Sequence, residues 1–137
     1  MVAISFSEIR FVDLIRAGIK DQTIRPYNWY RYGQIVRIWK LQLYYKMRTK
    51  ECFKIADAIP IELLRIRLYA PDAKIGHIQI LDDTGWRLAT KEEMLEFVRR
   101  DGFDTVHEFY KWFYGRYGER VYDMEFMAIR WKLCGGD

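Results

Sequence analysis

Features that mark several common classes of protein are scarce or missing in this sequence. Its 137 residues hold only two cysteines, Cys52 and Cys134, which lie far apart and form no CxxC pair. We therefore expect free, buried thiols and no disulfide. The two histidines, His77 and His107, are equally isolated. Since the spacing of metal ligands is missing, we expect no metal and no cofactor. No GxxxxGK phosphate loop occurs either.

Long apolar runs are also missing. A membrane-spanning helix needs about 18 or more consecutive apolar residues, and no segment approaches this length. The first six residues have no basic stretch before their apolar part and no small-residue cleavage site. We interpret them as mature sequence, which predicts a cytoplasmic protein without a membrane partner.

Amide side chains are few, with one asparagine and four glutamines, whereas 31% of the residues are charged. This bias is typical of proteins from hot environments, so we expect a thermophile protein. Half of the residues are hydrophobic and 17% are aromatic, which excludes a disordered chain. At this length the sequence predicts a single domain over residues 1–137.

Positive charge is concentrated in one part of the chain. Residues 1–54 contain 11 Lys and Arg against four Asp and Glu, whereas residues 55–137 contain 12 against 15. A basic half favours an anionic partner, and RNA or single-stranded nucleic acid fits this pattern. A basic face that is merely solvated is the alternative interpretation.

The hydrophobic pattern predicts sparse helices among many short strands. Apolar spacing favours a helix over 8–17 that ends at Gly18, and Thr90 and Thr105 each begin a capping box before a further helix. Pro71-Asp72 predicts a turn. Strands are expected over 2–6, 34–45, 52–59, 61–69, 76–81 and 122–133, with a loop over 19–34. This order indicates an α+β fold: a small, mostly antiparallel β-barrel with short helices at its ends.

The expected loop begins with the run Gly18-Ile19-Lys20-Asp21-Gln22-Thr23-Ile24-Arg25. It combines an amine, a hydroxyl and a guanidinium, the groups that acyl transfer uses as base, nucleophile and electrophilic donor. Thr23 is the candidate nucleophile and Lys20 its candidate base. Arg25 is suited to hold a phosphate or polarise a carbonyl. The alternative is that these residues bind a ligand without turnover, with Thr23 capping a turn.

Aromatic and basic residues alternate in the segment that follows. Cations contact phosphates and rings stack on unpaired bases, so this mixture is typical of nucleic-acid binding. We expect Trp39 to lie in the core of the barrel, and likewise the stripe formed by Phe109, Trp112 and Phe113. The candidate binding residues are Arg25, Trp29, Tyr30, Arg31 and Tyr32.

Four features, taken together and in order, resemble the ASCH domain family, a branch of the PUA-like barrels. They are the Gly18-x-Lys20-x-x-Thr23-x-Arg25 segment, the glycine-led segment 33–38, Asp101-Gly102-Phe103 ahead of a helix, and the strand 125–131. The resemblance implies a PUA-like β-barrel with a cleft beside the Lys20 segment. It also implies binding of RNA or of a nucleotide.

One bacterial branch of that family resembles an amidohydrolase that acts on acetylated cytidine. Its lysine and threonine correspond to Lys20 and Thr23, and its glutamate falls near Asp101, which is one methylene shorter. Asp21 stands where that branch has a threonine. The shorter Asp101 disfavours the close geometry that catalysis needs. We also expect the Asp21 carboxylate to pair with Lys20 and hold it protonated, so that deacetylation is weak or absent.

The sequence therefore predicts an RNA- or nucleotide-binding module as the first hypothesis. The first alternative is a metal-independent amidohydrolase acting on N4-acetylcytidine-type nucleosides. The second is a protein-interaction module whose aromatic segment forms a dimer contact. We expect a monomer or a weak dimer.

Overall fold

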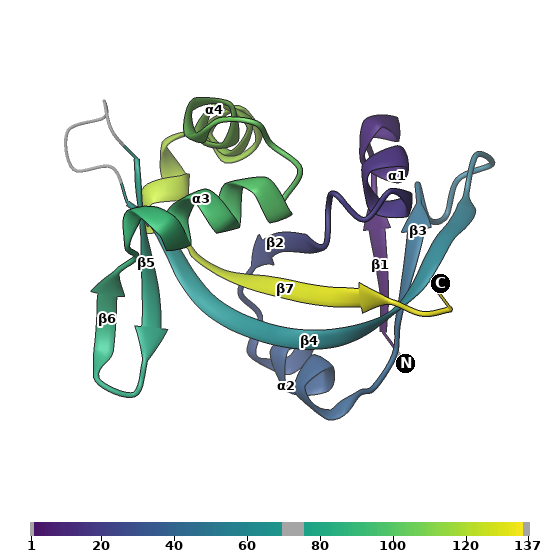
Figure 1. The fold of residues 1–137 in the computed structure, drawn as a ribbon, viewed down its shortest axis with the longest axis horizontal. Coiled ribbons are helices and arrows are strands. Elements are labelled where there is room, and N and C mark those ends of the chain that lie inside the picture. The colour runs from purple at the N-terminus through teal and green to yellow at the C-terminus, as the bar shows by residue number, and fades with distance from the viewer. Residues whose placement is uncertain (1, 70–75, 136–137) are drawn as a thin grey trace.

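The computed structural model describes residues 2–69 and 76–135. The strands are β1 (Val2–Phe6), β2 (Gln22–Pro26), β3 (Leu41–Tyr45), β4 (Phe53–Tyr69), β5 (His77–Asp82), β6 (Gly85–Leu88) and β7 (Glu125–Leu133). The helices are α1 (Ile9–Arg16), α2 (Trp29–Arg37), α3 (Lys91–Arg100) and α4 (Val106–Tyr117), followed by the 3₁₀ helix η1 (Gly118–Asp123) (Figure 1). None of these helices is long and apolar enough to cross a membrane. The expected turn at Pro71-Asp72 lies outside the described residues.

The long strand β4 organises the sheet. It pairs in antiparallel fashion with β3 near its start, with β5 near its end and with β7 along most of its length. Ala58 accordingly has a partner on each edge, Leu41 and Leu133. β1 joins β3 in parallel, which makes the sheet mixed. Because β4 curls along its length, the sheet forms half of a barrel (Figure 1). The α+β prediction is confirmed at this level.

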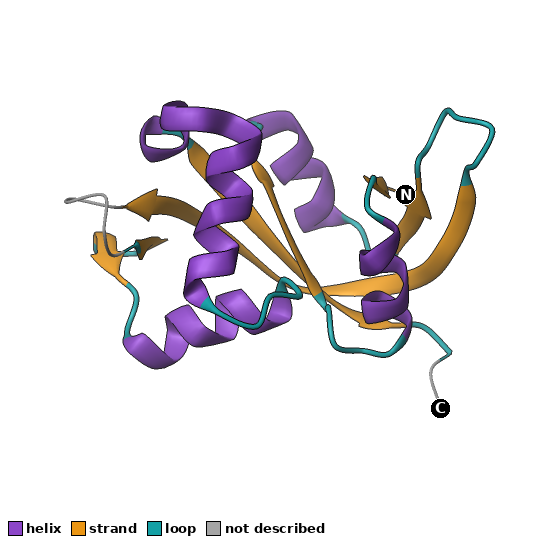
Figure 2. Ribbon diagram, turned by 90° about the horizontal axis from the view of Figure 1, so that it is seen from above, coloured by secondary structure: helices purple, strands orange, loops and turns teal. Residues whose placement is uncertain are grey.

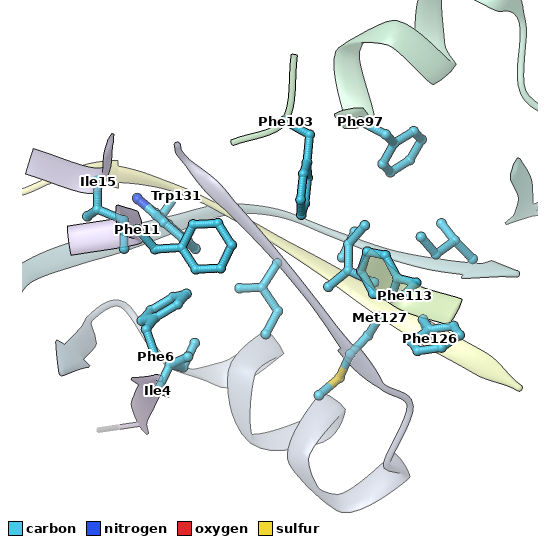
Figure 3. Close-up of a cluster of buried hydrophobic side chains, with 14 of the residues drawn as sticks. Ile4, Phe6, Phe11, Ile15, Phe97, Phe103, Phe113, Phe126, Met127 and Trp131 are labelled. Atoms are coloured by element: carbon cyan, nitrogen blue, oxygen red, sulfur yellow. The ribbon is translucent and has the colours of Figure 1, made fainter. Parts of the chain in front are cut away.

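Helices cover the curled sheet from two sides. α1, α3 and α4 lie on one side of the β4–β7 ribbon and α2 lies on the other (Figures 1 and 2). Side chains from β1, α1, α3, α4 and β7 meet in the core (Figure 3). Phe109 and Phe113 are buried there as predicted, whereas Trp112 is only half-buried.

The segment 29–37 is a helix, although we predicted a loop up to residue 34 and a strand from there. Asn28 caps this helix, since its side-chain oxygen accepts a hydrogen bond from the Arg31 amide at 3.0 Å. Ile35 is buried and Tyr32, three residues earlier, packs on the core beside it. Only residues 41–45 form a strand. Trp39, predicted in the core, is 74% exposed and lies in the connection between α2 and β3 rather than in a strand.

Other boundaries differ in smaller ways. The two strands predicted on either side of Pro60 are one strand, β4, with a register shift at the proline, which has no amide hydrogen to donate. The capping box at Thr90 is confirmed, with Glu93 completing both hydrogen bonds. Thr105 accepts from the Glu108 amide, but the Glu108 side chain reaches the Asp104 amide rather than that of Thr105. Cys52 is exposed rather than buried, and both cysteines are free.

Candidate functional site

Thr23 and Arg25 lie in a strand, β2, rather than in the predicted loop. β2 pairs with β7, which places Thr23 opposite Ile129. Alternate residues of a strand point to the same side, so the two side chains are neighbours. The Arg25 Nε atom donates a hydrogen bond to Thr23 Oγ1 at 3.0 Å. The hydroxyl and the guanidinium are therefore held together on one face.

Two backbone connections bring Lys20 to Asp101, which is far away in the sequence. Gly18 ends α1 with a φ of 77°, and the Lys20 amide then donates to the Leu14 carbonyl. The Asp21 amide donates to the Arg100 carbonyl, which ties this segment to the end of α3. Gly102 has a φ of 95°, and a Cβ there would lie 3.4 Å from Lys20 Cδ. A glycine at this position lets the lysine stem pass close to the backbone.

The Lys20 ammonium is buried against the C-terminal end of α3. Its Nζ atom donates to the Asp101 backbone oxygen at 2.6 Å and lies 3.6 Å from Asp101 Oδ1. Both side chains are at most 5% exposed. The partial negative charge of a helix C-terminus stabilises a cation in this position. The Phe11 ring, 4.5 Å from Nζ, adds a cation–π contact.

Burial shifts both partners toward their neutral forms. Loss of solvation lowers the pKa of Lys20 to about 8, although the Asp101 carboxylate acts in the opposite direction and Arg25 adds to the decrease. Burial raises the pKa of Asp101, against the influence of the Lys20 charge. The amine therefore titrates close to physiological pH, as a general base requires.

Asp21 does not hold Lys20 protonated, contrary to our expectation. Its carboxylate lies 3.5 Å from Arg100, while Lys20 pairs with Asp101 instead. Asp21 is placed by its backbone, since its amide binds α3 and its carbonyl accepts from the Trp131 amide. The part of the deacetylation argument that rests on Asp21 is therefore wrong.

Gln22 and Arg130 complete the surroundings of Asp101, and sequence reasoning did not assign them to the site. Gln22 Nε2 donates to Asp101 Oδ1 at 3.2 Å and to the Phe97 carbonyl at 2.9 Å. Arg130 Nε donates to Gln22 Oε1 at 2.9 Å, and its Nη1 donates to Glu62 at 2.7 Å. The available signal was a lone arginine inside the apolar run 126–131.

A cavity of about 320 Å³ opens beside these groups. Lys20, Thr23, Arg25 and Asp101 all line it, so the structure brings these four residues together at one cavity. Its size is at the lower end of the range for small-molecule pockets. Among the further lining residues are five aromatic or basic ones that sequence reasoning had not placed here: Phe6, Phe11, Trp112, Arg116 and Tyr117. We call this space the nucleophile cavity.

A second cavity of about 460 Å³ adjoins the first, and Ser5, Arg25 and Pro26 line both. Arg31, from the first turn of α2, and Arg48, from the turn between β3 and β4, complete a set of three guanidinium groups. None of the described residues that line this second space carries a carboxylate. We call it the arginine cavity.

The predicted aromatic binding residues lie outside both cavities. Trp29 and Tyr30 are 75% and 61% exposed on α2, with their rings edge to face at 5.9 Å. Tyr32 instead packs on the core and against Tyr27, at 5.6 Å between ring centroids. Trp29 and Tyr30 are thus accessible for stacking, and Tyr32 serves mainly to seat the helix.

The described ranges contain no group of three His, Cys, Asp or Glu side chains arranged to hold a metal ion. Comparison of the chain with protein-family models, curated proteins and solved structures finds no match. The main evidence on function is therefore the chemistry of the two cavities.

Proposed function

We propose that this chain is a PUA-like module of the ASCH type that binds RNA or a nucleotide, with one nucleoside unit in the nucleophile cavity. The observation that carries this proposal is the cavity itself, where aromatic rings surround a buried Lys20–Asp101 pair. The half-barrel and the Lys20, Thr23 and Arg25 segment beside the cavity support the ASCH assignment.

The lining of the nucleophile cavity offers both kinds of contact that a nucleobase makes, stacking on its faces and hydrogen bonding at its edges. Apolar rings such as Phe11 and Trp112 suit the faces of a planar base, and stacking on aromatic side chains contributes about 1–3 kcal/mol per base. The hydroxyl of Thr23 and the amine of Lys20 suit the polar base edges or the ribose. Exposed Trp29 and Tyr30 offer stacking surfaces to neighbouring nucleotides.

A direct test is the fluorescence anisotropy of a labelled single-stranded RNA decamer of mixed sequence, titrated at several KCl concentrations. We expect binding that weakens steeply with salt. Arg116→Gln, which changes a residue lining the cavity, should reduce affinity and lower the salt slope by about one. Arg120→Gln is the matched control, because this exposed arginine lines neither cavity.

Equal effects of the two arginine substitutions, or no binding at any salt concentration, would contradict the proposal. Size-exclusion chromatography on the same samples addresses the interaction-module alternative. A dimer that binds neither RNA nor nucleosides would favour that alternative.

Amide hydrolysis is the second candidate, and the lowered pKa of Lys20 beside Thr23 favours it. Neutral Lys20 would take the hydroxyl proton as Thr23 attacks the acetyl carbon of N4-acetylcytidine. The protonated amine would then return this proton to the leaving nucleobase amine, and water would release acetate from Thr23. Chromatography would detect cytidine. Release that is lost in both Lys20→Ala and Thr23→Ala would establish the activity, and no release from the native protein would exclude it.

A further inference from the structure

We propose that the arginine cavity is a phosphate site, in which Arg25, Arg31 and Arg48 bind a phosphate attached to the nucleoside in the nucleophile cavity. This inference rests on the proposed function and extends it, because it specifies a phosphorylated ligand over a free nucleoside. Three independent observations support it: a half-buried arginine without an ion pair, two uncommitted guanidinium groups and a backbone that fixes their positions.

The half-buried Arg25 guanidinium has no carboxylate among its hydrogen-bond partners. Its guanidinium donates to Thr23 Oγ1 and, at 2.6 Å, to the Ser5 carbonyl, both of which are uncharged. It forms no ion pair with any carboxylate of the described residues. Burial lowers the pKa of Arg25 to about 10, repulsion by Arg116 and Arg31 adds to the decrease, and Tyr117 and Asp101 offset it only in part. A desolvated cation without a counter-ion is unfavourable, so an anionic ligand would relieve this cost.

Arg31 and Arg48 are available to the same ligand. Within the described part of the chain, neither side chain donates a hydrogen bond or joins an ion pair. Some arginines elsewhere in this protein are paired with carboxylates. Arg65 and Arg87, for example, each make two hydrogen bonds to one carboxylate. Arg31 and Arg48 are therefore free to contact an anion in the cavity that they line together with Arg25.

The backbone around the three arginines is fixed from several sides. The turn that carries Arg48 has left-handed conformations at Lys46 and Arg48, with φ of 43° and 67°. β1 holds this turn, because the Lys46 amide donates to the Phe6 carbonyl at 2.9 Å and the Met47 amide to Ser5 Oγ at 3.0 Å. Arg25 is fixed in β2 and Arg31 in the capped first turn of α2. Such preorganisation lowers the entropic cost of binding.

The chemistry and the position of this cavity both favour phosphate over other anions. Guanidinium groups match the geometry of phosphate oxygens, and several of them surrounding one site suit a group with three or more acceptors. Ser5, Arg25 and Pro26 border both cavities, so the two spaces lie side by side. A nucleoside joined to a phosphate has this shape and this distribution of charge.

The test compares ligands with and without phosphate on matched arginine variants. The probes are the four common ribonucleosides, their 5′- and 3′-monophosphates and the dinucleoside monophosphates, titrated by calorimetry at 50 and 200 mM KCl. The variants are Arg31→Gln and Arg48→Asn, since asparagine tolerates a positive φ, together with the double variant. Arg37→Gln is the control, because Arg37 is exposed on the same helix and lines neither cavity.

We expect at least one monophosphate to bind about tenfold more tightly than its nucleoside, as one charge-assisted hydrogen bond would produce. The double variant should lose this gain and keep the affinity for the nucleoside, while Arg37→Gln changes neither. A gain with only the 5′- or only the 3′-monophosphate indicates a chain end. An equal gain with a dinucleoside monophosphate indicates an internal phosphodiester of RNA.

Two results would overturn this inference. If nucleosides and monophosphates bind equally, or if Arg37→Gln is as damaging as Arg31→Gln, the arginine cavity is not a phosphate site, although the nucleoside proposal stands. If nucleosides, monophosphates and RNA all fail to bind, both proposals fall. Thermal unfolding of each variant should match that of the native protein, since the substituted residues are exposed.

Discussion

A lysine ammonium that is almost removed from water needs other sources of stabilisation, and Lys20 receives them from one carbonyl, one carboxylate and two rings. The carbonyl terminates α3, so the field of the helix favours the charge. Desolvation still exceeds these contributions, which is why the pKa of Lys20 falls. The pKa of Lys20 should therefore respond to the removal of any one of these neighbours.

This sensitivity gives the first prediction. In carbon-13 NMR of protein labelled at the lysine side chains, Lys20 should titrate near pH 8, identified by the resonance that Lys20→Met removes. Asp101→Asn removes the charge that raises the pKa of Lys20, so its midpoint should move to lower pH. Arg25→Met removes a charge that lowers it, so the midpoint should rise. A midpoint above pH 10 in the native protein would show that the ammonium is solvated.

Gln22 is the residue on which the polar interior depends. Its amide joins Arg130 to Asp101, and all three side chains are buried. Gln22→Leu would remove the hydrogen bonds that Gln22 makes to Asp101 Oδ1 and to Arg130 Nε, so we expect a loss of about 2–4 kcal/mol in the free energy of unfolding. Urea denaturation would measure it.

Gln42→Leu in β3 provides the control for this substitution. Gln42 is half-buried and its side chain donates no hydrogen bond within the described residues. We expect a change of no more than about 0.5 kcal/mol. Similar losses for the two variants would show that the Gln22 bridge contributes nothing specific.

At the scale of the elements, the segment between α1 and β3 positions most of the candidate site residues. Its sequence did not clearly predict which parts form a strand and which a helix. β2 is short, and it becomes a strand because Thr23 and Ile24 find partners in β7, about a hundred residues later. α2 contains a mid-helix glycine and an apolar run that resembles a strand. Its capping by Asn28 and the burial of Ile35 outweigh these preferences.

Replacing each of two glycines by alanine tests the backbone conformation at the start of this segment and inside it. Gly18→Ala should destabilise the protein by about 1 kcal/mol, because Gly18 adopts a φ of 77° that disfavours a Cβ. Gly33→Ala should stabilise it by about 0.5–1 kcal/mol, because Gly33 lies inside α2 with open space around it. Thermal denaturation would show whether each variant is more or less stable than the native protein. A stabilising effect of Gly18→Ala would contradict the left-handed conformation at the end of α1.

At the scale of the whole molecule, charges form small networks in addition to the two cavities. Arg87 contacts Asp82 and Glu93, and Arg100 contacts Asp21 and Glu96. Networks of this kind, together with few amide side chains, are typical of proteins that work at high temperature. We expect a calorimetric unfolding midpoint above the range of about 45–65 °C that is common for mesophile domains. A midpoint inside that range would contradict the thermophile prediction.

The Arg87 network also predicts how stability depends on pH. Hydrogen bonds from Arg87 lower the pKa of Glu93 from 4.5 to about 2. A carboxylate with a lowered folded-state pKa contributes stability above its unfolded pKa and loses it as the pH falls through the folded value. The difference in unfolding midpoint between the native protein and Arg87→Gln should therefore be largest above pH 5 and shrink toward pH 2. A difference in unfolding midpoint that stays constant between pH 5 and pH 2 would show that the Arg87–Glu93 ion pair does not contribute to stability.

The sequence by itself determined the features that short-range chemistry controls. Gly18 ends a helix, Thr90 and Glu93 begin another, and the Lys20 segment collects reactive groups within a few residues. These depend on backbone conformation and capping, which neighbouring residues set. Tertiary structure decided the rest: Asp101 meets Lys20 because the Asp21 amide binds the end of α3, and Arg48 joins Arg25 and Arg31 because β1 holds its turn. Burial, which sets the pKa of Lys20, and convergence of distant cations arise only when the sheet curls and the helices close over it.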